Sequence, residues 1–335
     1  MRPGRAIAIA LSLTAATVVA ASTRGSRASF TAQASNPGNS MTAAASFPGI
    51  RVASGSYTGN GAAGTAVSVG FQPEVVIVKS DDASGVAEMR TSTMSGDNTK
   101  PLSGATGLTA SLIQSLTSSG FTIGSAAAVN SSGKPYHWVA FKSYSGQMGV
   151  GSYAGNGAVG HAITGLGFSP EYVIVLAAGA QRADQRMAGM SRTYQFDSDT
   201  GTTTGITSLD PNGFTVGTDA EVNASGSTYH YLGFNQNVGE MKTSSYPGTG
   251  SSHSITGVGF QPAYLIIHAD NSATARAGAH RSGALTGTSS QLFTAAINET
   301  IGITALQSDG FQVGTSTTAN ASGTTYDYVA FKDKP

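Results

Sequence analysis

One motif occurs three times in the chain and limits what it can fold into. The first copy reads G-F-T-I-G-x5-N-S-S-G-K-P-Y-H-W-V-A-F, from Gly120 to Phe141, and the others begin at Gly213 and Gly310. All copies step 9 residues from Phe to Asn, 3 to Gly, 3 to Tyr and 5 to the last Phe. This constant spacing predicts a tandem of three related units.

A second shared pattern precedes the motif in every unit. G-F-x-P leads into a dense run of apolar residues, most of them β-branched. The prolines are Pro73, Pro170 and Pro262, and the runs cover 75–78, 172–175 and 264–267. A short apolar run bounded by Pro and polar residues is typical of a central strand buried on both faces. A proline is tolerated there because it lies just before the hydrogen-bonded part of the strand.

About eight short strand candidates occur in each unit, and no segment has a sustained helical period. Strands at this spacing with Gly-rich turns predict an all-β fold of three antiparallel β-sandwich units, of jelly-roll or lectin-like type. We place the units at 48–143, 144–236 and 237–335. The chain has no cysteine, so disulfides cannot hold the units. We expect each unit to depend on its own apolar core.

The N-x-S-G-x-x-Y part of the motif predicts a tight turn between two strands. Gly accepts a positive φ freely, and Asn tolerates left-handed backbone geometry. Asn also bonds its own backbone in such turns, so we expect Asn130, Asn223 and Asn320 to belong to the turn. The turn explains these asparagines without glycosylation, although all three satisfy N-x-S/T.

The N-terminus predicts export. Residues 1–22 combine two arginines, an apolar run and small residues suited to cleavage, as in a secretory signal peptide. The apolar run, about 15 residues, is shorter than the roughly 20 that a membrane span needs. Residues 23–47 have no period and read as a flexible leader. We expect a secreted or cell-surface protein with no membrane span after signal cleavage.

The chain has few charges. Only 11% of residues are charged, and the formal net charge is +0. This balance argues against nucleic acid, whose binding needs a basic surface. A neutral surface rich in hydroxyl groups suits sugars and other uncharged polymers, and it is also usual for a Gly/Ser/Thr-rich β protein.

The pattern G-S-Y-x-G-N-G … G-F-x-P-x-x-V-I-V-K … V-N-x-S-G-x-x-Y resembles the repeats of phage tail-fibre and tail-tip proteins and of related exported bacterial proteins. Those domains look like lectin-type, concanavalin-like β-sandwiches. The resemblance covers residues 49–332. It implies the fold and a role in surface attachment, and it supplies no catalytic residue.

Candidate ligand-binding residues lie in two kinds of segment. Tyrosines beside Gly-rich loops suit stacking on sugar rings, although each also suits a core position. Arginines in the divergent segments 80–107, 177–204 and 268–300 suit anions or sugars, although loop solubility explains them equally. The candidates are Tyr57, Asn60, Tyr153, Asn156, Arg182, Arg186, Arg192, Tyr246, Arg276 and Arg281.

Catalysis and metal binding have weaker support. We find no ionisable residue that recurs in all three units, and we predict no catalytic residue and no cofactor. Glu74 and Glu171 align, but the third unit has Ala263 there. Asp197 and Asp199 have the alternate spacing of calcium ligands, without the later bidentate acid. A polar loop explains them as well.

These observations favour a secreted, non-enzymatic protein that binds a glycan or polymer surface, with specificity in the divergent segments. Three linked sites would strengthen weak binding. Two alternatives remain open. One is a structural component of a sheath, matrix or filament that assembles through its β units. The other is a polysaccharide-degrading enzyme, which needs two carboxylates across a cleft.

Overall fold

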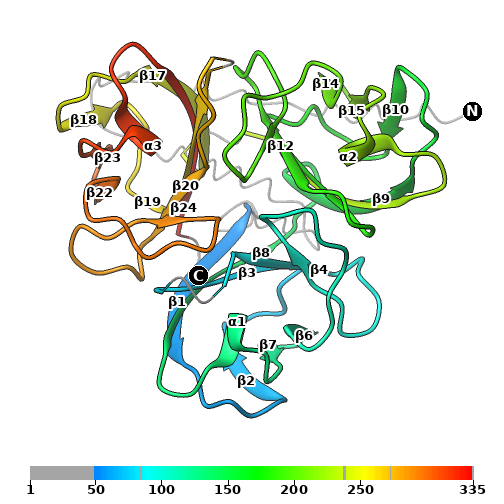
Figure 1. Ribbon diagram of the computed structural model, residues 1–335, viewed down its shortest axis with the longest axis horizontal. Helices are drawn as coiled ribbons and strands as arrows, with labels where there is room; N and C mark the ends of the chain where they lie inside the picture. The colour runs from blue at the N-terminus through cyan, green and yellow to red at the C-terminus, as the bar shows by residue number, and fades with distance from the viewer. Residues whose placement is uncertain (1–48, 83–84, 237–238, 272, 334–335) are drawn as a thin grey trace, which may run out of the picture. The chain divides into compact units, whose positions relative to one another are not determined.

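Each repeat is organised around one strand that is buried on both faces. The computed structural model describes residues 49–82, 85–236, 239–271 and 273–333, and these lie in one compact unit, Pro48–Pro335. The central strands are β3 (Val75–Ser80), β11 (Tyr172–Ala177) and β19 (Pro262–Asp270), one in each repeat. Figure 1 labels β3 and β19. Every residue of β3 and β11 is buried, which confirms the prediction from the apolar runs.

Each repeat contains eight strands and one short helical turn within the described residues. Repeat 1 also has β1 (Arg51–Thr58), β2 (Thr65–Ser68), β4 (Glu88–Thr91), β5 (Lys100–Pro101), β6 (Ile113–Thr117), β7 (Gly120–Ile123), α1 (Ala127–Asn130) and β8 (Pro135–Lys142). Repeat 2 also has β9 (Met148–Ala154), β10 (His161–Thr164), β12 (Ala183–Met187), β13 (Tyr194–Gln195), β14 (Ile206–Asp210), β15 (Gly213–Val216), α2 (Ala220–Asn223) and β16 (Thr228–Phe234). Repeat 3 also has β17 (Met241–Pro247), β18 (His253–Thr256), β20 (Ala279–Ser282), β21 (Gln291–Leu292), β22 (Ile303–Gln307), β23 (Gly310–Val313), α3 (Thr317–Asn320) and β24 (Thr325–Lys332).

Two antiparallel sheets form a sandwich in every repeat, as the sequence predicts. In repeat 1 the large sheet has the order β1-β8-β3-β4-β5 and the small sheet the order β2-β7-β6. Repeats 2 and 3 have the same orders with their own strands. The sheets meet through side chains such as Phe121 of β7, which packs edge-on against Trp138 of β8 at 6.0 Å between ring centroids.

The large sheet of each repeat borders two cores. Successive side chains of a strand point to opposite faces. Val76 and Val78 therefore enter the sandwich of repeat 1, whereas Val75 and Ile77 enter a core formed by residues of all three repeats. The expectation that each unit depends on its own core was wrong in this respect, because the outer face of each large sheet is also apolar and needs a partner.

The last Phe of each motif lies in the shared core. The rings of Phe141, Phe234 and Phe331 are separated by 5.4, 5.1 and 5.0 Å, pairwise, in edge-to-face geometry. The equivalent Phe of each repeat thus contacts those of the other two, so each repeat packs against both of the others.

The divergent segments join neighbouring repeats. Repeat 1 contacts repeat 2, repeat 2 contacts repeat 3, and repeat 3 contacts repeat 1. Examples are Lys100 Nζ donating to Gln181 O at 2.6 Å, Arg276 N donating to Asp199 O at 3.3 Å, and Asn298 Nδ2 donating to Asp81 Oδ1 at 2.8 Å. These segments differ between repeats, and so do the three contacts that they form.

The motif asparagines do not use the left-handed backbone geometry that Asn tolerates. Ser111 is the one non-glycine residue with positive φ in the described part of the chain. Asn130 instead ends α1, and its side-chain amide donates to Gly124 O at 2.7 Å and to Ala62 O at 2.8 Å. The left-handed positions belong to the following glycines, such as Gly133 with φ of 76°, which confirms the prediction for Gly.

Candidate ligand-binding site

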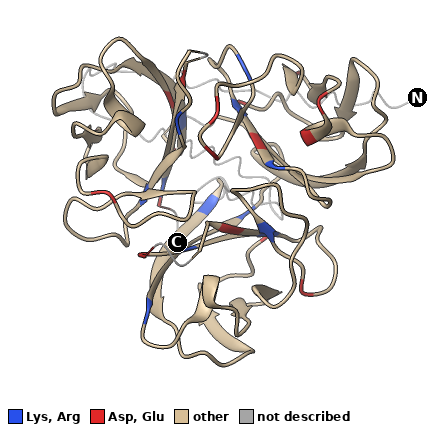
Figure 2. Cartoon of the chain, viewed as in Figure 1, with Lys and Arg blue, Asp and Glu red and all other residues tan. Residues whose placement is uncertain are grey.

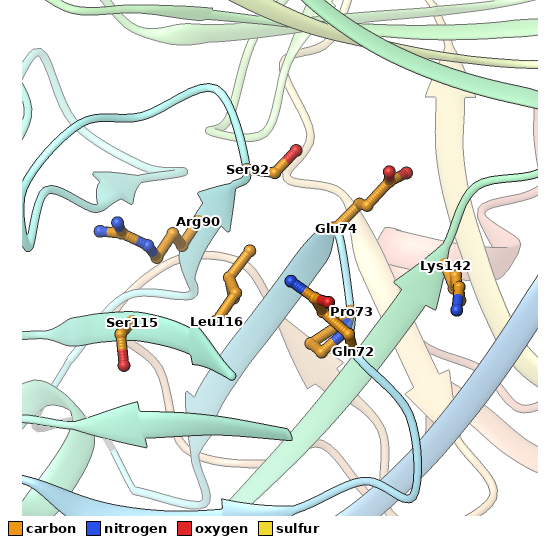
Figure 3. Close-up of a pocket in the computed structure, with 8 residues that line it drawn as sticks. All are labelled: Gln72, Pro73, Glu74, Arg90, Ser92, Ser115, Leu116 and Lys142. Atoms are coloured by element: carbon orange, nitrogen blue, oxygen red, sulfur yellow. The ribbon is translucent and has the colours of Figure 1, made fainter. Parts of the chain in front are cut away.

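A cavity of about 420 Å³ opens on repeat 1 where the large and small sheets approach each other (Figure 3). Its walls come from the segment before β3, the end of β4, the middle of β6 and the end of β8. The lining residues are Gln72, Pro73, Glu74, Arg90, Ser92, Ser115, Leu116 and Lys142. The cavity thus has polar and apolar surface in similar amounts, with Pro73 and Leu116 as its apolar residues.

Backbone hydrogen bonds fix the Gln72–Glu74 segment. Glu74 N donates to Phe141 O and Ser92 N donates to Glu74 O, both at 2.8 Å. The Glu74 carboxylate is held as well, because its Oε2 accepts from Ser143 N at 3.0 Å. The cavity therefore contains one carboxylate in a defined position.

Arg90 forms a rigid wall of the cavity. The residue is 6% exposed, and its terminal nitrogens donate to the carbonyl oxygens of Met94, Gly96, Asn98 and Ile113. Burial lowers the pKa of this guanidinium. Figure 3 shows the guanidinium pointing away from Gln72. Arg90 thus orders the 94–98 loop, and its charge is already solvated by backbone carbonyls.

Three side chains of the cavity keep free polar groups. Gln72, Ser92 and Lys142 make no side-chain hydrogen bond or ion pair with any residue that the structure describes. With Glu74 they offer an amide, a hydroxyl, an ammonium and a carboxylate around one space. Such groups can exchange hydrogen bonds with a polyhydroxylated molecule.

The other repeats lack this polar set. The hydrogen bond from Ser92 N to Glu74 O recurs as Ala188 N to Glu171 O and as Gly283 N to Ala263 O, all at 2.8 Å. These bonds identify equivalent positions. Repeat 2 keeps the carboxylate but loses the hydroxyl, and repeat 3 loses both. The repeats are therefore not chemically equivalent at this site.

The candidate tyrosines pack against the sandwich cores; Tyr246 is buried, and Tyr57 and Tyr153 are half-buried. Each stacks on the motif tyrosine of the same repeat, at 5.2 to 5.5 Å between ring centroids. Each hydroxyl donates to a backbone carbonyl in or near the short helix. The pairs are Tyr57 with Val129 O, Tyr153 with Val222 O and Tyr246 with Ala319 O. Burial raises the pKa of all three. This geometry is that of a core aromatic.

Asn60 and Asn156 bind the motif asparagines. Asn60 N donates to Asn130 Oδ1 at 2.8 Å, and Asn156 N donates to Asn223 Oδ1 at 2.9 Å. Each side-chain oxygen also accepts from the backbone two residues later. These contacts hold the first Gly-rich loop against the motif turn.

The five candidate arginines bind protein groups, and none of them lines the cavity. Arg182 forms ion pairs with Asp197 at 3.2 Å and with Glu221 at 3.5 Å. The other four donate to backbone carbonyls. These are Arg186 to Ile206 O, Arg192 to Gly201 O, Arg276 to Thr317 O, and Arg281 to several carbonyls that include Ile303 O.

Strand register corrects one interpretation of the sequence. Arg90, Arg186 and Arg281 pair with equivalent residues of the central strands, and each binds the first carbonyl of the next strand of the small sheet. An ionisable residue therefore does recur in all three repeats. We missed it because the surrounding segments differ in length and sequence.

The aspartates of the calcium hypothesis also bind protein groups. Asp197 accepts from Ser103 Oγ, from Gly104 N at 2.9 Å and from Arg182 Nε. Asp199 Oδ2 accepts from Gln195 N at 3.1 Å. Among the described residues, no group of three or more His, Cys, Asp or Glu side chains is placed to hold a metal ion.

One family model matches the chain three times, over residues 8–143, 84–238 and 237–334. The family is described as a domain of unknown function, DUF7483. The chain belongs to the DUF7483 family. Its three matches agree with the tandem repeat in the sequence and with three sandwiches in the structure. No curated protein and no solved structure matches this DUF7483 chain. The resemblance to tail-fibre and lectin-like repeats stays a prediction.

Charge and hydrophobicity can also be compared with the predictions. Lys, Arg, Asp and Glu are sparse and spread over the DUF7483 repeats (Figure 2). Within the part of the chain that the structure describes, no helix is both long and apolar enough to cross a membrane. The predicted signal peptide, 1–22, and leader, 23–47, lie outside the described residues.

Proposed function

We propose that this protein is a secreted, non-enzymatic binder of a glycan or other hydroxyl-rich polymer, and that the cavity of repeat 1 is its binding site. The observation that carries the proposal is the set of free polar groups around Gln72, Ser92 and Lys142, beside the fixed carboxylate of Glu74. A few placed polar groups beside apolar surface are the usual composition of a small-molecule site.

The cavity supports binding better than hydrolysis. Glycoside hydrolysis generally uses two carboxyl groups on opposite sides of the sugar bond. Glu74 is the one carboxylate among the residues that line the cavity. A single carboxylate can accept hydrogen bonds from sugar hydroxyls, and the ammonium of Lys142 and the amide of Gln72 can donate to sugar oxygens.

The proposal places one site on each chain. In repeat 3, Gly283 and Ala263 remove the hydroxyl and the carboxylate, while Gln261 and Lys332 keep the amide and the ammonium. In repeat 2, Ala188 removes the hydroxyl. Avidity would then come from several chains on one polymer, because a single chain offers one complete set of groups.

A polysaccharide array followed by titration calorimetry tests the proposal on the full chain. We expect binding with one site per chain. Gln72→Ala and Lys142→Ala should each weaken it about tenfold or more, since each removes hydrogen bonds to the ligand. Lys332→Ala is the matched control, because Lys332 follows Phe331 as Lys142 follows Phe141. Equal losses in all three variants, or assembly of the chain without any glycan binding, would contradict the proposal.

A further inference from the structure

Two cationic side chains lie opposite each other beside the cavity of repeat 1. Arg51 of β1 pairs with Lys142 of β8 in antiparallel register. Side chains that are directly opposite in such a pair lie on the same face of the sheet. Because Lys142 lines the cavity, Arg51 lies on the face from which the cavity opens. Like charges directly opposite each other destabilise a sheet, so this arrangement is unfavourable without an anion near both groups.

An aromatic ring holds the guanidinium of Arg51. Its Cζ lies 4.7 Å from the ring centroid of Phe71, and Phe71 immediately precedes Gln72, which lines the cavity. Nε of Arg51 is buried and has no hydrogen-bond partner among the described residues. A guanidinium that stacks on a ring presents N–H donors around its rim, in the planar arrangement that matches the oxygens of an anionic group.

No described carboxylate forms an ion pair with these cations. Arg51 and Lys142 also make no side-chain hydrogen bond with any residue that the structure describes. Two carboxylates lie in the vicinity. Glu74 lines the same cavity, and Glu240 of repeat 3 lies against Gly49. The donors of the two cations are therefore available to a ligand.

The other repeats carry different charges at these two positions. In repeat 2 the pair is Gln147 and Asn235, joined by a hydrogen bond from Asn235 N to Gln147 O at 2.7 Å. In repeat 3 the pair is Glu240 and Lys332, joined by Lys332 N to Glu240 O at 2.8 Å. Repeat 2 thus has two neutral residues, repeat 3 has opposite charges, and repeat 1 has two cations. The two cations occur in the repeat whose cavity has the complete polar set.

We propose that the ligand of this cavity is an acidic polysaccharide, and that its anionic group lies between Arg51 and Lys142. The inference rests on the proposed function and narrows its ligand to polymers whose sugars carry carboxylate or sulfate groups. The sugar hydroxyls bond to Gln72, Ser92 and Glu74, while the guanidinium and the ammonium donate to the anionic oxygens. The volume of about 420 Å³ is within the usual range for a small-molecule site.

An array of matched polysaccharides tests the inference on the full chain. It pairs a polyuronate with its methyl ester and a sulfated galactan with the unsulfated galactan, and calorimetry gives each affinity. We expect the acidic member of at least one pair to bind about tenfold more tightly than its neutral partner, because hydrogen bonds to charged groups are stronger. The pair that shows this difference identifies the anionic group. The preference should shrink between about 50 and 500 mM sodium chloride, since salt screens partly exposed charges.

Arg51→Gln gives repeat 1 the residue that repeat 2 has at the same position, Gln147. It should weaken binding of the acidic member about tenfold and leave the neutral member within about twofold, because Arg51 bonds only to the anionic group. Lys332→Asn is the matched control. It removes one positive charge from repeat 3, introduces the residue of repeat 2, and should change neither affinity. If Arg51→Gln does not fold, the matched polysaccharides on the unaltered chain still decide.

The outcomes separate this inference from the proposed function. Equal affinity for the acidic and neutral members would overturn the acidic ligand and leave a site for neutral glycans. A folded Arg51→Gln chain that keeps the acidic preference would overturn it as well, because the anionic group would then lie elsewhere. No binding to any member of the array would overturn both proposals.

Discussion

The indole of Trp138 lies directly over Gly55 on the neighbouring strand. The two residues are paired across β8 and β1. A Cβ atom added to Gly55 would lie 2.5 Å from Cζ2 of Trp138, which is closer than packed atoms approach. The equivalent pairs are Gly151 with Tyr231 and Ser244 with Tyr328. A small residue on the edge strand thus leaves room for the large aromatic beside it.

Gly55→Ala should therefore destabilise the protein, although Ala normally suits a strand better than Gly. We expect a loss of about 1–3 kcal/mol in the free energy of unfolding, because the indole must move. Denaturant unfolding followed by Trp138 fluorescence measures the change. Ser244→Ala is the matched control and should cost less than about 1 kcal/mol. A stabilised Gly55→Ala variant would show that the indole moves freely.

Phe234→Ala should weaken all three repeats together. The ring contacts Phe141 and Phe331 in the shared core, and removal of a buried Phe side chain costs about 3–5 kcal/mol. Trp138 is the only tryptophan and reports on repeat 1, whereas circular dichroism reports on every repeat. We expect both signals to shift to the same lower midpoint. An unchanged Trp138 midpoint would mean that the repeats unfold independently.

Asn223→Ala should strongly lower the free energy of unfolding, because the Asn223 side chain is fully buried and both of its amide atoms form hydrogen bonds. Its Nδ2 donates to Gly217 O and Ala158 O, and its Oδ1 accepts from Asn156 N. Each partner left unbonded costs about 1–3 kcal/mol. We expect a loss of roughly 3 kcal/mol in urea unfolding, against less than 1 kcal/mol for the exposed Asn156→Ala. Similar losses in both variants would mean that the stability depends on the loop as a whole and not on the hydrogen bonds of Asn223.

Stability should fall as the pH rises from about 4 to about 8. Burial raises the pKa of Glu88 to about 8 and of Asp327 to about 7, the latter with a contribution from Asp270. Each carboxyl is protonated in the folded protein at pH values where the unfolded chain has lost the proton. Its stabilisation is complete below the unfolded pKa and is lost as the pH passes the folded value.

Asp327→Asn and Glu88→Gln should flatten this dependence and raise the stability at pH 8, by on the order of 1–3 kcal/mol each. Burial lowers the pKa of Lys79 and Lys100 from 10.5 to about 8. Their burial therefore opposes folding fully below pH 8 and progressively less as the pH rises from 8 toward 10.5. Denaturant unfolding between pH 4 and pH 10 measures both effects. A wild-type stability that increases from pH 5 to pH 8 would contradict the assignment.

Part of the cavity could be anticipated from the sequence, and part could not. The G-F-x-P pattern and the aligned Glu74 and Glu171 were visible, but Arg90 and Ser92 lie in a segment without recognisable alignment. Only the pairing of β3 with β4 and with β8 shows that Arg90 and Ser92 line the same cavity as Lys142, which lies 50 or more residues later in the chain. For the candidate tyrosines, the sequence pattern was clear but the proposed role in binding was not supported by their positions. Their repetition was clear, and the structure places them in core packing.

The sequence by itself determined the number of repeats, their strands and the burial of the central strand, because turn glycines and apolar periodicity act over a few residues. Tertiary structure decided that Val75 and Val76, neighbours in the chain, belong to different cores, and that Arg51 lies opposite Lys142. The reason is physical. Local preferences fix which residues form strands, whereas only the packing of one repeat on another decides what covers the outward faces of those strands.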